Sequence, residues 1–132
     1  MTVYNVLLWM GALYGFTAVA LGAFGAHGLK PQLDAYQLSI FEKAVQYQFV
    51  HTLAIVLAAL LWRSQPNIWL QFAGISFALG ILLFSGSLYL LATRHLMHMN
   101  YAWLGPVTPV GGLFFLAGWM LLMIAAVKGS RL

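Results

Sequence analysis

The four histidines of this sequence are the side chains whose chemistry is most easily tuned, and they are unevenly placed. His27 ends a run of small residues, GAFGAHG, and His51 lies inside an uncharged stretch. His95 and His98 share the segment HLMHM. Because an ionisable side chain is costly within hydrocarbon, a histidine in a hydrophobic segment is a candidate for function.

Hydroxyl, phenol and amide groups collect in the same half of the hydrophobic stretches as the histidines. Gln48 lies three residues before His51 and Tyr47 lies four before it, so each shares a helical face with His51. Buried polar groups must find partners or water. The sequence therefore predicts a polar pocket in one half of the bilayer. We expect it to open on the distal side of the membrane, which is the side opposite the two termini. Its candidate residues are His27, Tyr47, Gln48, His51, Ser85, Ser87, Tyr89 and Thr108.

Each of these candidates also has a simpler interpretation. His27 fits an interfacial histidine that caps carbonyls at a helix end. His51 fits a neutral core histidine bonded to a neighbouring helix, and Ser85 fits a helix-packing serine. Against the simpler interpretation of His27, Gly22, Gly25 and Gly28 would let the second or third helix approach closely enough for this imidazole to join the pocket.

His95 and His98 raise the alternative of a metal site, because imidazole and thioether ligands suit Cu(I). No acidic residue or cysteine adds charge in this segment, and two further ligands are not evident. We therefore predict no metal and no cofactor, with His95 and His98 as weak candidates only. Haem held between His51 and another histidine is weaker still.

The sequence favours a non-enzymatic protein. Asp34 and Glu42 are its only acidic residues, and it has no cysteine. Paired carboxylates, an H-E-x-x-H motif, a phosphate-binding loop and a G-x-S-x-G elbow are all missing from the sequence. The six lysines and arginines stand singly beside apolar runs, a pattern that disfavours nucleic acid as a partner.

Membrane-spanning helices must position these residues, because 63% of the chain is apolar and only 6% is charged. Four uncharged stretches are long enough to cross about 30 Å of hydrocarbon. We predict a single domain over residues 1–132, an all-α membrane protein built as an antiparallel bundle of four transmembrane helices. The predicted spans are 3–26, 44–62, 68–93 and 106–127.

Two segments need separate interpretation. The first span contains Ala18-Val19-Ala20, a pattern typical of signal-peptide cleavage, but no Lys or Arg precedes it and it runs uncharged to Ala26. We predict that it is retained. Residues 32–43 place apolar side chains on one helical face, which predicts a short amphipathic connector helix that either lies at the interface or prolongs the second span.

Small residues recur at helical spacing within the spans and predict close helix packing. The sequence leaves open whether these stripes pack within one molecule or between copies. The predicted helix-packing glycines are Gly11, Gly15, Gly22, Gly25, Gly86, Gly111, Gly112 and Gly118.

The distribution of positive charge is nearly balanced across the membrane. The N-terminal amine, Arg63, Lys128 and Arg131 fall on the side of the termini, and Lys30, Lys43 and Arg94 fall on the distal side. The positive-inside rule then gives a slight preference for cytoplasmic termini, which we predict.

Four motifs occur in a familiar order: LGAFGAHGL at 21–29, AVQYQFVHTLAI at 44–55, LFSGSLYLLA at 83–92 and VTPVGGLFFLAGW at 107–119. With this order and spacing the chain resembles the bacterial DUF 423 family of small inner-membrane proteins. The resemblance implies a four-span inner-membrane protein whose activity is not established. It supplies no catalytic residues.

The sequence favours a structural, accessory or oligomer-forming membrane subunit. Its expected partners are the lipid bilayer and either further copies of itself or a larger membrane complex, and a small-molecule ligand is compatible with the polar pocket. A channel or carrier for a small solute is the first alternative. A metal-binding membrane protein is the second.

Overall fold

The structure is a computed structural model that describes residues 1–98 and 100–129. Within this part every regular element is helical, which confirms the all-α fold class. Four helical segments are long and apolar enough to cross a membrane: Val3–Leu29, Ala35–Ser64, Ile68–Thr93 and Ala102–Gly129. Two of them contain π-helical turns, η1 and η2. The elements are α1 (Val3–Phe24), η1 (Gly25–Leu29), α2 (Ala35–Ser64), α3 (Ile68–Gly80), η2 (Ile81–Ser85), α4 (Gly86–Thr93), η3 (Ala102–Leu104) and α5 (Val107–Gly129).

Local capping sets where α2 begins. The Asp34 carboxylate accepts a hydrogen bond of 2.7 Å from the backbone N–H of Gln37, and the Gln37 side chain accepts one of 3.0 Å from the N–H of Asp34. This reciprocal capping box starts a helix that runs without interruption to Ser64. The amphipathic segment is therefore a prolongation of the second span. The separate connector helix that the sequence also allowed is not formed.

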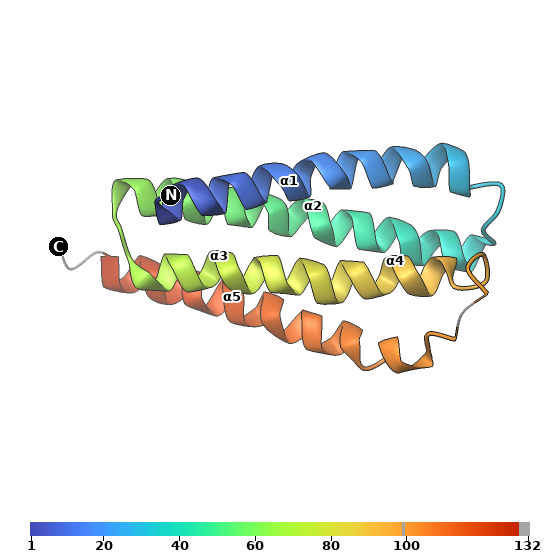
Figure 1. Cartoon of the computed structure of the whole chain (residues 1–132). Coiled ribbons are helices and arrows are strands. Elements are labelled where there is room, and N and C mark those ends of the chain that lie inside the picture. The colour runs from blue at the N-terminus through green and yellow to red at the C-terminus, as the bar shows by residue number, and fades with distance from the viewer. Residues whose placement is uncertain (99, 130–132) are drawn as a thin grey trace.

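The spans alternate in direction, so the chain returns to the end at which it started. Figure 1 shows the start of α1 and the end of α5 at one end of the bundle, together with the turn between α2 and α3. The opposite, distal end carries the connections from η1 to α2 and from α4 to α5. His27 lies in η1 at this end, and His95 and Trp103 belong to the connection from α4 to α5.

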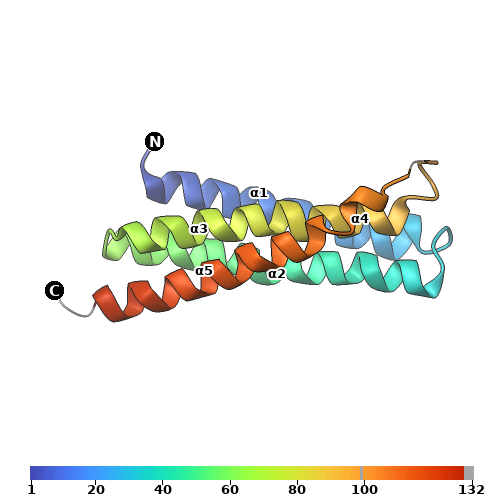
Figure 2. The ribbon, with the colours of Figure 1, turned by 90° about the horizontal axis from the view of Figure 1, so that it is seen from below.

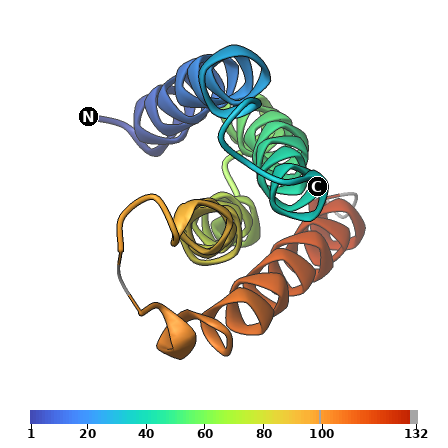
Figure 3. The same cartoon turned by 90° about the vertical axis from the view of Figure 1, so that its right-hand side faces the viewer.

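The bundle is open on one side. Helix α1 packs along α2, α2 packs on α3, and α5 packs along α3 and η2. Within the described residues α2 and α5 scarcely approach one another. Viewed from the distal end, α5 crosses obliquely beneath the other helices, and in the view from below it lies across the bundle (Figures 2 and 3).

The glycine stripe of α1 packs against α2 within the same molecule. A Cβ on Gly11 would lie 2.7 Å from Val56 Cγ2, and a Cβ on Gly25 would lie 2.6 Å from the Phe41 ring. Gly15 and Gly22 meet α2 at 3.4 and 3.3 Å. Small residues thus bring the first span close to α2 from Gly11 to Gly25, as close packing in lipid requires.

A second set of glycines joins α3 and η2 to α5. The Phe115 ring fills the space above Gly80, where an added Cβ would clash with it. The Phe77 ring fills the space above Gly118, where an added Cβ would lie 2.5 Å from the ring. Gly111 lies against the backbone of η2, and a Cβ there would be 2.8 Å from the Cα of Phe84. This seam also lies within the molecule.

Two predicted packing glycines do not make such contacts. A Cβ on Gly86 would meet only the Ile81 carbonyl oxygen at 4.0 Å, and one on Gly112 would meet only the Phe84 ring at 3.9 Å. Gly112 is the helical neighbour of Gly111, about 100° around the axis, so it faces away from the seam. The prediction that Gly86 and Gly112 pack closely is wrong for the single molecule.

Candidate functional site

Gln48 is the centre of a buried polar cluster between α1, α2 and α4. Its amide nitrogen donates to the Tyr14 carbonyl at 2.9 Å and to the Thr17 hydroxyl at 2.8 Å. Its amide oxygen accepts a hydrogen bond of 2.7 Å from the Tyr89 hydroxyl. Both amide donors and the amide oxygen are therefore occupied, and this cluster is internally bonded.

His51 belongs to a different cluster, between α2 and α5. Its Nδ1 lies 2.8 Å from the Tyr47 carbonyl oxygen, which can only accept a hydrogen bond. Its Nε2 lies 3.2 Å from the indole Nε1 of Trp119, which can only donate. These two partners together define a neutral imidazole with its proton on Nδ1, and neither ring nitrogen is left free.

Aromatic rings pack His51 in place. The imidazole stacks on Phe115, with ring centroids 3.6 Å apart and planes 8° from parallel. Tyr47 stacks on Phe84 at 4.5 Å. Phe115 is itself held over Gly80, so the close α3–α5 seam positions the ring against which His51 rests.

The remaining hydroxyl candidates tie helices together. The Ser85 hydroxyl donates across the bundle to the Ala44 carbonyl at 2.8 Å. Ser87 and Thr108 share a hydrogen bond of 2.6 Å that joins α4 to the start of α5. Ser85 and Ser87 are buried, so these bonds satisfy groups that would otherwise be costly in hydrocarbon.

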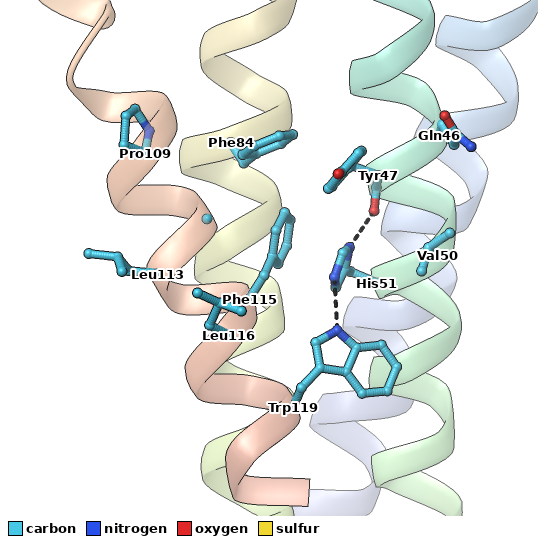
Figure 4. A pocket seen from close by; sticks show the side chains of 11 residues that line it. Gln46, Tyr47, Val50, His51, Phe84, Pro109, Leu113, Phe115, Leu116 and Trp119 are labelled. Atoms are coloured by element: carbon cyan, nitrogen blue, oxygen red, sulfur yellow. Dashed lines mark hydrogen bonds between the residues drawn. The ribbon is translucent and has the colours of Figure 1, made fainter.

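A groove of about 670 Å³ lies between α2 and α5, with η2 as its floor. Figure 4 shows α5 diverging from α2 toward the distal end, while Trp119 reaches across to His51 and closes the proximal end. Most lining residues are apolar or aromatic. They are Gln46, Tyr47, Val50, His51, Phe84, Pro109, Gly112, Leu113, Phe115, Leu116 and Trp119.

The single pocket predicted from the sequence is thus divided. Tyr47 and His51 line the groove, whereas Gln48 and Tyr89 form the internally bonded cluster on the other side of α2. His51 lies sixteen residues after Ala35 and thirteen before Ser64, near the middle of α2. The functional role of all these residues stays a prediction.

His27 does not join either cluster, so the expectation that it enters the polar pocket is wrong. Its side chain is exposed, whereas Gly25 and Leu29 on the same π-helical turn are buried. Residues two apart on a helix point to nearly opposite sides. Because Gly25 packs against Phe41, His27 must face away from the bundle.

The distal histidines make local contacts. His95 Nδ1 lies 3.1 Å from the Gln37 side-chain amide, and His95 Nε2 lies 3.2 Å from the Gln32 carbonyl oxygen. His98 is exposed, with a left-handed φ of 50°. The described residues bring no three histidine or acidic side chains together as metal ligands. Met99, a thioether of the HLMHM segment, lies outside the described residues.

Four residues of these clusters were not predicted from the sequence: Tyr14, Thr17, Phe115 and Trp119. Tyr14, Thr17 and Trp119 had a signal that could have been used. Tyr14 and Thr17 are direct neighbours of Gly15 and Ala18 in the small-residue stripe that faces α2, and Trp119 directly follows Gly118 of the α5 seam. Residues that border a close-packing stripe lie at the edges of the helix contact, where a polar side chain can reach the next helix.

The fold and the composition define a multi-pass membrane protein with four helical spans. The chain belongs to the DUF423 family, described as proteins of unknown function, whose model matches residues 21–112. It is 42% identical to the UPF0382 inner membrane protein YgdD of Escherichia coli K12 over 95% of this chain and 92% of the relative. It is 41% identical to the UPF0382 membrane protein SH2409 of Staphylococcus haemolyticus over 94% of this chain and 97% of that relative. No solved structure matches the chain.

Proposed function

We propose that this protein is a non-enzymatic accessory protein of the bacterial inner membrane, and that it acts by binding another membrane component in the α2–α5 groove. The groove is the observation on which this proposal rests. Its volume of about 670 Å³ falls in the range of binding pockets, roughly 300–1,000 Å³, which are mostly apolar with a few placed polar groups. The residues on its two rims, such as Val50 and Leu116, are exposed to the surrounding bilayer.

The state of the polar side chains supports a binding role over a catalytic one. A general base needs a free nitrogen within reach of a substrate proton. Both nitrogens of His51 are engaged, by Tyr47 and Trp119. The cluster around Gln48 is satisfied in the same way and supports structure.

The relatives support the location. Those in Escherichia coli are named inner membrane proteins, and the equivalent place for this chain is the cytoplasmic membrane of its cell. We place both termini in the cytoplasm, so the distal end faces outward. A second copy of the chain or a subunit of a larger complex is a candidate for the bound component, alongside lipid.

A small-solute channel or carrier is the second function that the sequence suggested. The hydrogen bonds favour it less. Gln48, Tyr89, Tyr14 and Thr17 bond to one another, so their polar groups are not available to line a path for a solute.

Native mass spectrometry of the protein released from membrane-derived nanodiscs tests the proposal. We expect a component bound in fixed ratio to the wild-type chain, and its loss in Gly112→Leu, which fills the groove where an added side chain has room. Ala12→Leu, on the exposed face of α1, adds the same side chain elsewhere and should retain the component. A wild-type monomer that carries nothing would contradict the proposal.

A further inference from the structure

We propose that the α2–α5 groove holds the hydrocarbon chain of an anionic lipid from the distal leaflet, with the headgroup beside Lys43 and Tyr47. This inference rests on the proposed binding function and names its ligand class. It is carried by the length of the groove, by the position of its closed end, and by the placement of its free polar and charged groups.

The groove has the length of one leaflet. Along α5 it runs from Pro109 to Trp119, ten residues, which at 1.5 Å per residue is about 15 Å. Half of a hydrocarbon core of about 30 Å is the same length. Trp119 and His51 lie near the middle of α5 and α2, so the groove starts near the distal surface and ends near the bilayer midplane.

The closed end excludes a transmembrane helix as the occupant. Trp119 bridges to His51 at 3.2 Å, so the two walls meet there (Figure 4). A helix with its side chains is about 10–12 Å across and must continue through the whole membrane. A hydrocarbon chain needs no passage beyond the midplane, so the tapering groove fits a lipid tail.

The interior of the groove is complementary to an apolar ligand. Phe84 and Phe115 form its floor, and Val50, Leu113 and Leu116 form its rims. The two polar side chains at the closed end satisfy each other, because the Trp119 indole donates to His51. A polar group placed there would find no partner and would be costly.

The distal end of the groove is instead complementary to a polar headgroup. The Tyr47 hydroxyl lies at this end and has no hydrogen-bond partner among the described residues. Lys43 lies four residues before Tyr47, one helical turn nearer the distal surface on the same face of α2. Its side chain is exposed, and it lies beside no carboxylate on that face, since Glu42 points about 100° away around the helix. A lysine one turn above a free hydroxyl complements an anionic headgroup.

Quenching of tryptophan fluorescence by brominated lipids tests this inference. The chain has five tryptophans, so the test uses a variant that keeps only Trp119 and a matched variant that keeps only the lipid-facing Trp9. Each full-length variant is placed in vesicles of phosphatidylcholine with a minor share of phosphatidylglycerol. In one set of vesicles the phosphatidylcholine is brominated, and in the other the phosphatidylglycerol. The bromine atoms are on the acyl chains, near the bilayer midplane.

We expect brominated phosphatidylglycerol to quench Trp119 more strongly than its mole fraction in the vesicle predicts. The preference of the groove for this lipid over phosphatidylcholine should be about fivefold, which corresponds to ~1 kcal/mol for one lysine at an anionic headgroup. Trp9 should show no preference between the lipids. Lys43→Gln should abolish the preference at Trp119. Lys30→Gln, which removes the same charge at the distal end of α1, should retain it.

Two results would overturn the inference, and they differ in what they mean for the proposed function. Equal quenching of Trp119 by both lipids, with or without Lys43, shows that the groove does not select an anionic lipid. Protection of Trp119 from both lipids while Trp9 is quenched shows that a protein segment fills the groove, which retains a binding function but excludes lipid as the ligand. The proposed function itself fails only if mass spectrometry finds no bound component.

Discussion

Trp119 and His51 join α5 to α2 through one hydrogen bond of 3.2 Å, close to the middle of both helices. Elsewhere these two helices scarcely approach each other within the described residues. The bond therefore closes one end of a groove whose other end is left open to the bilayer. The open side of this bundle and the histidine near the middle of α2 thus belong to the same feature.

Replacing Trp119 with Phe should release α5 from α2 at this point. The aromatic ring stays, but the donor to His51 is lost, and interhelical hydrogen bonds in membranes contribute about 0.6–2 kcal/mol. Because the chain has no native cysteine, spin labels at Val50→Cys and Leu113→Cys report the groove width directly. We expect a broader and longer distance distribution than in the wild type. Trp9→Phe is the matched control, and an unchanged distribution in Trp119→Phe would refute the bridging role.

The protonation pattern of His51 is a second prediction. The Tyr47 carbonyl requires the proton on Nδ1, and the Trp119 indole requires a lone pair on Nε2. Nitrogen NMR of protein with ¹⁵N-labelled histidine should show a protonated Nδ1 and an unprotonated Nε2 for His51 at neutral pH. His51→Asn identifies the signal by its loss. The reverse tautomer, or a ring protonated on both nitrogens, would contradict the described geometry.

Adjacent glycines on α5 should respond in opposite ways to the same substitution. Gly111→Ala places a methyl group against the backbone of η2, which cannot move aside as a side chain can, and overpacking of this kind costs about 1–3 kcal/mol. Gly112→Ala meets nothing closer than 3.9 Å and gains helix propensity. The apparent Tm in mild detergent should fall clearly for the first and stay or rise slightly for the second. Equal Tm values for both would show that the α3–α5 seam is wrongly placed.

The bond between Tyr89 and Gln48 should appear as a coupling energy. Tyr89→Phe removes the donor at 2.7 Å, and Gln48→Leu removes the acceptor together with the bonds to Tyr14 and Thr17. We expect Gln48→Leu to cost more than Tyr89→Phe, and the double variant to cost less than the sum, with a coupling of about 0.6–2 kcal/mol. Unfolding in a denaturing detergent measures each free energy. Strict additivity would exclude a direct interaction.

Reporter fusions test the orientation. The structure places the start of α1 and the end of α5 at the same end of the bundle (Figure 1). Reporters fused before Met1 and after Leu132 should therefore agree with each other, and we expect both to read cytoplasmic. A reporter inserted in the loop between η1 and α2 should give the opposite signal. If both terminal reporters gave a periplasmic signal, the predicted orientation would be reversed, but the fold would be unaffected.

The sequence by itself determined the features that depend on one helix at a time. Uncharged stretches of the right length predicted all four spans, because a backbone in hydrocarbon must satisfy its own hydrogen bonds. Asp34 and Gln37 form a local capping box, and the apolar face of residues 32–43 already allowed the second span to be prolonged. The spacing of Gly11, Gly15, Gly22 and Gly25 predicted a packing stripe, which depends only on helix periodicity.

Only the tertiary structure decided which polar groups meet. Side chains at the same depth can lie on opposite sides of one helix. Depth alone therefore grouped Gln48 with His51 in the prediction. In the structure Gln48 forms hydrogen bonds with α1 and α4, whereas His51 forms one with α5. The same limit misplaced His27, whose direction follows from the packing of Gly25 on Phe41. The groove itself depends on the oblique path of α5, which the Gly111 and Gly118 contacts with η2 and α3 impose. Helix rotation and crossing are properties of pairs of helices, and a single sequence read one helix at a time does not contain them.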